Sequence, residues 1–199
     1  MENCYTREQI EKATNEKGHK YFTGGDYDVN IIGVRNSETK NKVTNKFDDC
    51  LTLSYKIDGE WQFHCFPCTT DPGTHWVENI MNDKGVEILK PGQYRGSHTL
   101  RLHQGKYLAL GQQKPVKVYR DNNRDNKYDL LEENVHEGIY GINIHKAGAD
   151  STYVENWSEG CQVFKRAADF EEFMKICRKS RDKHGNSFTY TLIESTDIK

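Results

Sequence analysis

A histidine and a cysteine share the most informative stretch of the chain, residues 138–164. His145 ends the apolar segment Gly-Ile-Tyr-Gly-Ile-Asn-Ile, and Cys161 follows a small-residue turn from Ser158 to Gly160. A thiol becomes a nucleophile when a neighbouring imidazole takes its proton. A glycine just before the cysteine lets the main chain turn tightly and present N–H groups beside the sulfur. The pair predicts covalent catalysis at a carbonyl; a core histidine and a buried thiol are the alternative.

This stretch resembles the catalytic signature of the L,D-transpeptidase family. That signature is an Ile-His pair at a strand end, then a loop, then Ser-x-Gly-Cys. Here the pair is Ile144-His145, and Cys161 follows the histidine by 16 positions, a separation that suits the family. The resemblance covers residues 50–165, and its last third carries the specific motif. It implies that Cys161 is the nucleophile and His145 its base, acting on peptidoglycan stem peptides through a thioester.

The resemblance also implies roles for the neighbouring residues. The main-chain carbonyl of Lys146 would orient the imidazole, and Ser158 would shape the turn. The N–H groups of Gly160 and Cys161 would contribute to an oxyanion site. The expected activity is that of an L,D-peptidase, carboxypeptidase or transpeptidase, and no cofactor is expected to be required for catalysis.

Three positions depart from the family pattern. Glu159 stands where the family usually has histidine, Val163 where it often has arginine or asparagine, and Lys146 where glycine is common. The departures leave hydrolysis and transpeptidation open. They also favour an alternative function, a non-catalytic virion or wall-binding module that keeps the fold. Thiol labelling is expected to separate the two, because a stabilised catalytic thiolate at Cys161 alkylates faster than the other cysteines.

The catalytic pair needs a rigid support, and the chain predicts many short strands with two helices. The longer helix carries Phe170, Phe173, Met174 and Cys177 on one face. Helices are expected over 6–17 and 167–182, and strands over 27–35, 51–56, 61–66, 98–103, 106–111, 115–119, 139–145 and 187–194. This pattern predicts a β-dominated α+β domain. The resemblance makes the expected fold more specific: an L,D-transpeptidase-like β-sandwich or barrel with a C-terminal helix and a closing strand. Residues 1–40 are expected as a helix and strand packed onto a catalytic domain of residues 41–199, within one structural unit.

A polar loop over 121–132 has the oxygen spacing of an EF-hand calcium loop. The residues at loop positions 1, 3, 5, 7, 9 and 12 are Asp121, Asn123, Asp125, Lys127, Asp129 and Glu132, with Lys127 offering its carbonyl. Asn126 replaces the usual glycine at position 6 and tolerates left-handed geometry. A structural calcium ion is therefore one expectation, and a solvated Asx-rich turn is the other.

Other residues are candidates for lining the cleft or binding a metal. His98 and His103 flank a strand that leads to Tyr107, and Trp157 precedes the Ser158 turn, so His98, Tyr107 and Trp157 are expected to contact the substrate. Surface or packing histidines are the alternative for His98 and His103. Cys65 and Cys68, with His64 and His75 nearby, leave a zinc peptidase as a third function class.

Composition narrows the partners and the compartment. The chain has 28 Lys and Arg against 30 Asp and Glu, for a net charge of −2, and it lacks an apolar run long enough for a transmembrane helix. Nucleic-acid binding and membrane insertion are therefore not expected. The N-terminus lacks the pattern of a secretory signal, so we expect a cytoplasmic product with free thiols at its 6 cysteines, including Cys4. Release to the cell wall during phage lysis, or packaging in a virion, would then bring it to its substrate. The sequence does not indicate an oligomeric state.

Overall fold

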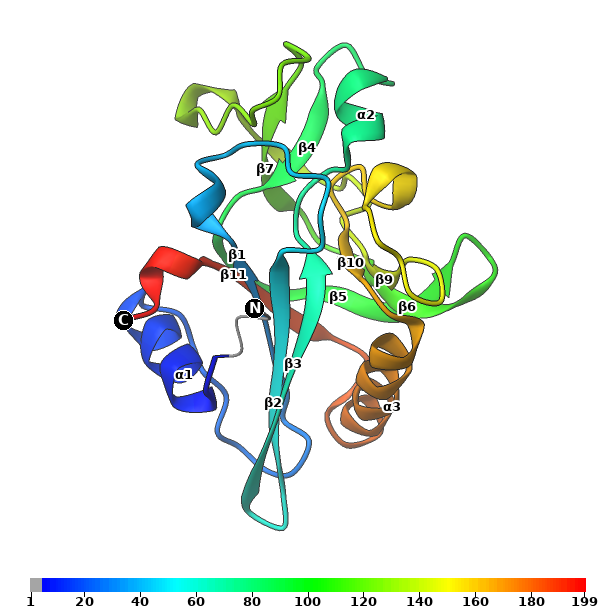
Figure 1. Ribbon diagram of the computed structural model, residues 1–199. Coiled ribbons are helices and arrows are strands. Elements are labelled where there is room, and N and C mark those ends of the chain that lie inside the picture. Colours follow the sequence, from blue (N-terminus) through cyan, green and yellow to red (C-terminus); the bar gives the residue numbers. More distant parts are fainter. Residues whose placement is uncertain (1–4) are drawn as a thin grey trace.

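The computed structural model describes residues 5–199, so Cys4 and the first residues of the predicted 1–40 segment lie outside the described part (Figure 1). The elements in chain order are α1 (Arg7–Glu16), β1 (Asn30–Arg35), β2 (Asp49–Ile57), β3 (Glu60–Thr69), α2 (Thr74–Glu78), β4 (Val86–Leu89), β5 (Gly92–His103), β6 (Tyr107–Gln112), β7 (Val116–Asp121), β8 (Val135–Gly138), β9 (Ile144–Lys146), β10 (Gln162–Phe164), α3 (Ala167–His184) and β11 (Phe188–Glu194). Short 3₁₀ helices cover Ser37–Thr39, Glu132–Asn134, Glu155–Trp157 and Ser195–Asp197.

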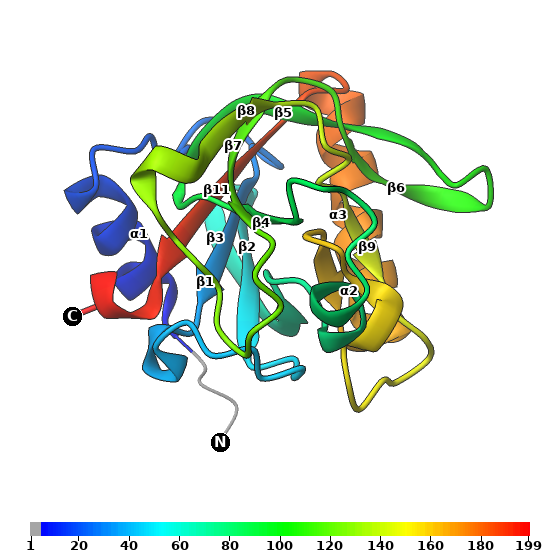
Figure 2. The ribbon, with the colours of Figure 1, turned by 90° about the horizontal axis from the view of Figure 1, so that it is seen from above.

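Within residues 5–199, eight strands close a barrel in the order β1-β11-β5-β6-β9-β10-β3-β2. Two neighbouring pairs are parallel, β1 with β11 and β9 with β10, and the others are antiparallel. A separate three-stranded sheet, β4-β7-β8, lies at one end of the barrel (Figures 1 and 2). The first strand of the chain therefore pairs with the last, which joins the N-terminal segment to the same barrel as the site.

Alternation along the strands separates the inside of the barrel from its outer face. Ile31 pairs with Leu53 on one side and Tyr190 on the other, and all three belong to the buried interior. The next residue along β1, Ile32, points outward instead, where it packs under α1 with Ile10. Removing such apolar surface from water stabilises the fold by about 25 cal/mol per Å².

The two longer helices cover different parts of the barrel. α1 begins with a capping box, in which Thr6 accepts from the Gln9 N–H and the Gln9 side chain accepts from the Thr6 N–H. α3 places Phe170 and Phe173 against Phe164 of β10, with ring centroids 5.5 and 5.0 Å apart. α3 is thereby attached to the strand that directly follows Cys161.

The expected β-dominated α+β class is confirmed, as are both long helices, the β2–β3 hairpin and the closing strand β11. The expected strand over 139–145 is wrong in extent, because β9 begins at Ile144. The N–H groups of Tyr140 and Ile142 donate to the Gln112 side chain and not to a neighbouring strand. Four short elements were not predicted from the sequence: α2, β4, β8 and β10.

Candidate active site

The β9–β10 register brings the predicted pair together. In this parallel pair Val163 lies opposite His145, and Gln162 lies opposite Ile144. Ile144 and Gln162 point into the barrel, where Gln162 accepts a hydrogen bond from Tyr190. Because side chains alternate, His145 points to the outer face, on the side where Cys161 precedes β10.

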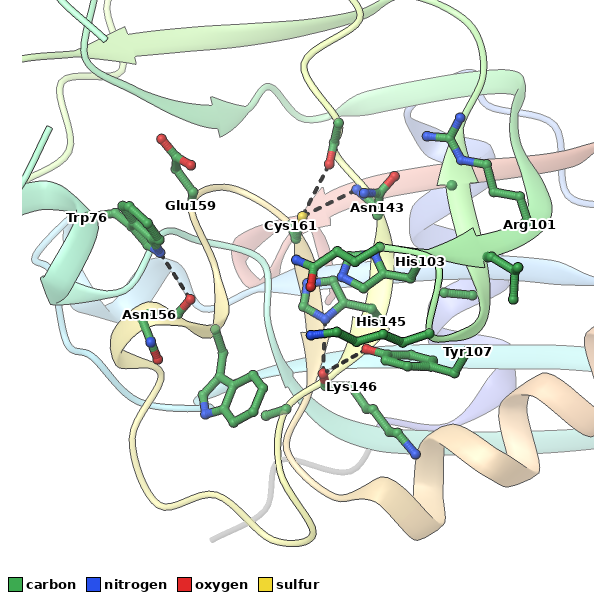
Figure 3. Close-up of a pocket in the computed structure, with 18 residues that line it drawn as sticks. Trp76, Arg101, His103, Tyr107, Asn143, His145, Lys146, Asn156, Glu159 and Cys161 are labelled. Atoms are coloured by element: carbon green, nitrogen blue, oxygen red, sulfur yellow. Dashed lines mark hydrogen bonds between the residues drawn. The ribbon is translucent and has the colours of Figure 1, made fainter. Parts of the chain in front are cut away.

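His145 and Cys161 line the same pocket, which has a volume of about 820 Å³ (Figure 3). The outer face of the barrel forms its floor, and α2 and the loop before Ser158 form a wall. The lining residues are Trp76, Arg101, Leu102, His103, Gln104, Lys106, Tyr107, Ala109, Gly111, Gly141, Asn143, His145, Lys146, Ala147, Asn156, Trp157, Glu159 and Cys161. A pocket of this size accommodates a short peptide.

The His145 ring is fixed by one hydrogen bond and one stacking partner. Its Nδ1 lies 2.9 Å from the carbonyl oxygen of Lys146. Because a carbonyl only accepts, Nδ1 carries the proton and Nε2 keeps a lone pair. The ring of His103 stacks on it, with centroids 4.4 Å apart. Burial lowers the pKa of His145 to about 4, and the positive charge that His103 can carry acts in the same direction. The imidazole is therefore neutral at physiological pH, as a general base must be.

The sulfur of Cys161 makes its hydrogen bonds with the main chain. The thiol donates to the Gly141 carbonyl at 3.2 Å, and the Asn143 N–H donates to the sulfur at 3.5 Å. Within residues 5–199, no hydrogen bond joins this sulfur to the His145 ring. Burial raises the pKa of Cys161 to about 11, and the charges of Glu159 and Glu87 add to the effect. The resting group is a neutral thiol.

Hydrogen bonds inside the turn hold the main chain that carries Cys161. The Ser158 hydroxyl donates to the Cys161 carbonyl at 2.8 Å and accepts from the Gly160 N–H at 3.1 Å. Gly160 has a φ of +136°, and a Cβ there would lie 2.2 Å from the Glu87 carbonyl oxygen. The turn thus requires glycine at this position. The Gly160 N–H is engaged by Ser158, which corrects the expectation that it faces a developing oxyanion.

The structure does not bring His98 into the pocket. Its side chain is 0 % exposed inside the barrel, where its two nitrogens bond with the Ser97 hydroxyl and the Ile142 carbonyl. The predicted substrate contact at His98 is therefore wrong, because β5 turns that residue inward. His103, five positions later, faces outward and lines the pocket. His98 and Gln112 instead hold the segment that leads into β9.

Tyr107 and Trp157 do line the pocket, as expected. The Tyr107 hydroxyl donates to the Lys146 carbonyl at 3.4 Å, and the Lys146 ammonium pairs with Glu171 at 3.0 Å. Other lining residues were not predicted from the sequence, among them Trp76, Arg101 and Asn143. Asn143 lies two positions before His145 and so shares its face, a signal that was present in the sequence.

The predicted calcium loop forms a series of Asx turns. The side chains of Asp121, Asn123 and Asp125 each accept the main-chain N–H two residues ahead, at 3.3, 3.0 and 2.7 Å. Asp129 accepts from the Asn123 side-chain amide at 3.0 Å. The main chain of Lys127 forms an isolated antiparallel β-bridge with that of Lys42. The Glu132 carboxylate is held by Lys90 and Tyr119. Calcium binding stays a prediction, and it requires Glu132 to leave these partners.

The candidate zinc ligands do not converge. Cys65 packs on the outer face of the barrel and Cys68 in its interior, and His64 stacks between Tyr55 and Phe66. Across residues 5–199, no three His, Cys, Asp or Glu side chains are grouped so that they could hold a metal ion. In the same range Cys50, Cys65, Cys68, Cys161 and Cys177 form no disulfide, and Cys4 lies outside it.

Comparison with known proteins returns no matching family model, no matching curated protein and no matching solved structure. None of the helices in residues 5–199 combines the length and apolar character needed to cross a bilayer. The site's chemistry must therefore be inferred from its own residues.

Proposed function

We propose that the chain is a cysteine enzyme that forms a thioester with a peptide carbonyl, with Cys161 as nucleophile and His145 as base. The observation that carries this proposal is that an imidazole oriented by a hydrogen bond and a thiol line the same pocket. The Lys146 carbonyl fixes the tautomer that leaves Nε2 free to accept a proton. The resemblance of residues 144–161 to L,D-transpeptidases supports the proposal that the substrates are the stem peptides of peptidoglycan.

The reaction begins when the Cys161 thiol turns from the Gly141 carbonyl toward Nε2 of His145. Nε2 takes the thiol proton while the sulfur bonds to the carbonyl carbon, and the carbonyl oxygen becomes an oxyanion. The imidazolium then gives its proton to the leaving amine as the C–N bond breaks, which leaves a thioester on Cys161. Water or an amine attacks the thioester, His145 takes a proton from it, and the thiolate leaves as a thiol.

Burial keeps both the thiol and the imidazole neutral at rest, which favours the general-base route. A thiol whose pKa is about 11 and an imidazole whose pKa is about 4 do not form an ion pair at rest. The proton therefore moves in concert with attack on the substrate. The Asn143 N–H, which already donates to the sulfur, stabilises the charge that develops there. The Cys161 N–H is the candidate oxyanion donor at the turn.

A second candidate is a non-catalytic wall-binding or virion module with the same pocket. It is favoured by the resting hydrogen bond from the thiol to Gly141 and by the high thiol pKa. In that case the pocket binds the same peptides, and the thiol serves only to hold the turn. The two functions differ in turnover, which only the enzyme shows.

The test is digestion of purified muropeptides, followed by chromatography and mass spectrometry. The wild type is expected to release product and to show a covalent adduct on Cys161, whereas Cys161→Ala and His145→Asn lose both. His136→Gln, a histidine on β8 that does not line the pocket, serves as the matched control. Equal activity in the wild type and Cys161→Ala removes the nucleophile. Binding without turnover in any variant favours the module.

A further inference from the structure

The candidate pocket has opposite charges at its two ends. Figure 3 shows Trp76, Asn156 and Glu159 on one side of Cys161, and Arg101, His103 and Tyr107 on the other. Lys106, on the turn between β5 and β6, also lines the pocket, and its positive charge acts on His103. A pocket that is positive at one end and negative at the other orients a substrate with complementary charges.

Arg101 and Glu159 make no direct hydrogen bond or ion pair with another side chain of the described residues, although the charge of Arg120 acts on Glu159 through space. The charged neighbours of this region are paired, Lys146 with Glu171 at 3.0 Å and Arg120 with Glu87. Unpaired charges that line a pocket beside a nucleophile are available to a ligand.

A glycine on β6 leaves the space that the Arg101 side chain occupies. On β6, Gly111 lies opposite Thr99, and Ala109 lies opposite Arg101. A Cβ at Gly111 would lie 1.9 Å from Nε of Arg101, so the side chain crosses β6 through the space that this glycine leaves. Arg101 therefore lies over the strand, toward the pocket, in a position that one added methyl group would block.

The opposite end combines a carboxylate with an aromatic face. The Trp76 indole N–H donates to the Asn156 carbonyl at 3.1 Å, which fixes the ring at the pocket wall. Glu159 lies two residues before Cys161, and its charge acts on the thiol, which places it near the reacting sulfur. A carboxylate beside an indole ring is a favourable environment for an ammonium group, through charge pairing and cation–π attraction.

We propose that Arg101 and Glu159 determine specificity, so that the substrate carries a carboxylate on one side of the reacting carbonyl and an ammonium group on the other. This inference rests on the proposed function, because it takes Cys161 as the reacting atom. It selects peptides with a free terminal carboxylate and a free side-chain amine. Peptides in which either group is already amidated or acylated, as in a crosslinked wall, are poor substrates.

The test uses four synthetic stem-type peptides, with the terminal carboxylate free or amidated and the side-chain amine free or acetylated. Binding is measured by calorimetry with Cys161→Ala, and kcat/KM is measured with the wild type. Loss of either charge is expected to weaken binding and lower kcat/KM about tenfold. In Arg101→Gln, amidation has no further effect, and in Glu159→Gln, acetylation has none. Gly111→Ala keeps the arginine but reproduces the Arg101→Gln pattern.

The controls are Arg95→Gln and Glu133→Gln, which remove the same charges outside this pocket and keep the wild-type pattern. Equal affinity of Cys161→Ala for all four peptides, or no binding of the doubly charged one, overturns the inference. So does a penalty for amidation that persists in Arg101→Gln. Charge-dependent binding without turnover supports the charge assignment while removing the proposed reaction, whereas cleavage of all four peptides at equal rates does the opposite.

Discussion

The imidazole rings of His103 and His145 stack face to face, with centroids 4.4 Å apart and planes inclined by 19°. Two positive charges at that distance repel, so at least one ring is neutral. Burial lowers the pKa of His103 as well, and the charges of Arg101 and Lys106 lower it further. The β5–β6 hairpin thus buries the ring and supplies positive charge beside it, and both effects disfavour protonation of His145.

Replacing His103 with alanine is expected to raise the pKa of His145 by about one unit, because water reaches the ring and a like charge is gone. The midpoint of the acidic limb in the pH profile of kcat/KM is expected to shift to higher pH by the same amount. The midpoint of the His145 ring titration, followed by NMR, should shift with it. His103→Phe keeps the stacked surface and is expected to leave the pKa nearer to its low value. An unchanged titration in His103→Ala would mean that the stack has no electrostatic role.

Acid is expected to destabilise the fold through His98 and His145. The pKa of each is about 4 in the folded protein, against an ordinary value near 6.5. Between those values the unfolded chain binds more protons, so stability is fully present above pH 6.5 and is lost as the pH falls toward 4. Each histidine accounts for up to about 3 kcal/mol. Urea unfolding at several pH values measures the slope, which His98→Gln should reduce. The same slope in this variant would contradict the assignment.

The placement of His145 and Cys161 in one pocket was predictable because both residues lie in one short segment. A parallel neighbour of β9 has to follow a crossover, and residues 147–161 provide it. The need for glycine at position 160 is equally local. By contrast, Trp76 and Arg101 come from distant segments, and β10 has 3 residues, too few for a period to be read.

The two histidines of β5 show how much the alternation of side chains along a strand can predict. His98 and His103 are five positions apart, so they must face opposite sides of a regular strand. The sequence could have excluded one of them from the cleft. It could not show which one, because that depends on how the barrel closes, which brings β5 and β6 beside β9. The early start of β5 at Gly92 was missed for a related reason, since its first residues are polar and glycine-rich.

Cys161 is expected to react slowly with iodoacetamide at pH 7, which reverses the expectation drawn from the sequence. With a pKa of about 11, roughly one thiol in ten thousand is ionised at that pH. A substrate-like acylating agent should still modify Cys161, because His145 removes the proton during attack. Mass spectrometry of the labelled peptides measures both the alkylation and the acylation of Cys161. Rapid alkylation at pH 7 that disappears in His145→Asn would point to a resting ion pair in place of the general-base route.

The strongest single effect on the turn is expected from Gly160→Ala. The φ of +136° is unfavourable for any side chain, and the new Cβ would lie 2.2 Å from the Glu87 carbonyl oxygen, a main-chain atom of β4 that cannot move alone. We expect a loss of about 3 kcal/mol in the free energy of unfolding, with loss of turnover. Gly185→Ala is the matched control, because its φ is also positive, +89°, but a Cβ there meets no atom within 4 Å. It should cost about 1 kcal/mol. Equal losses in the two variants would show that strain alone, and not the contact with β4, fixes the turn that presents Cys161.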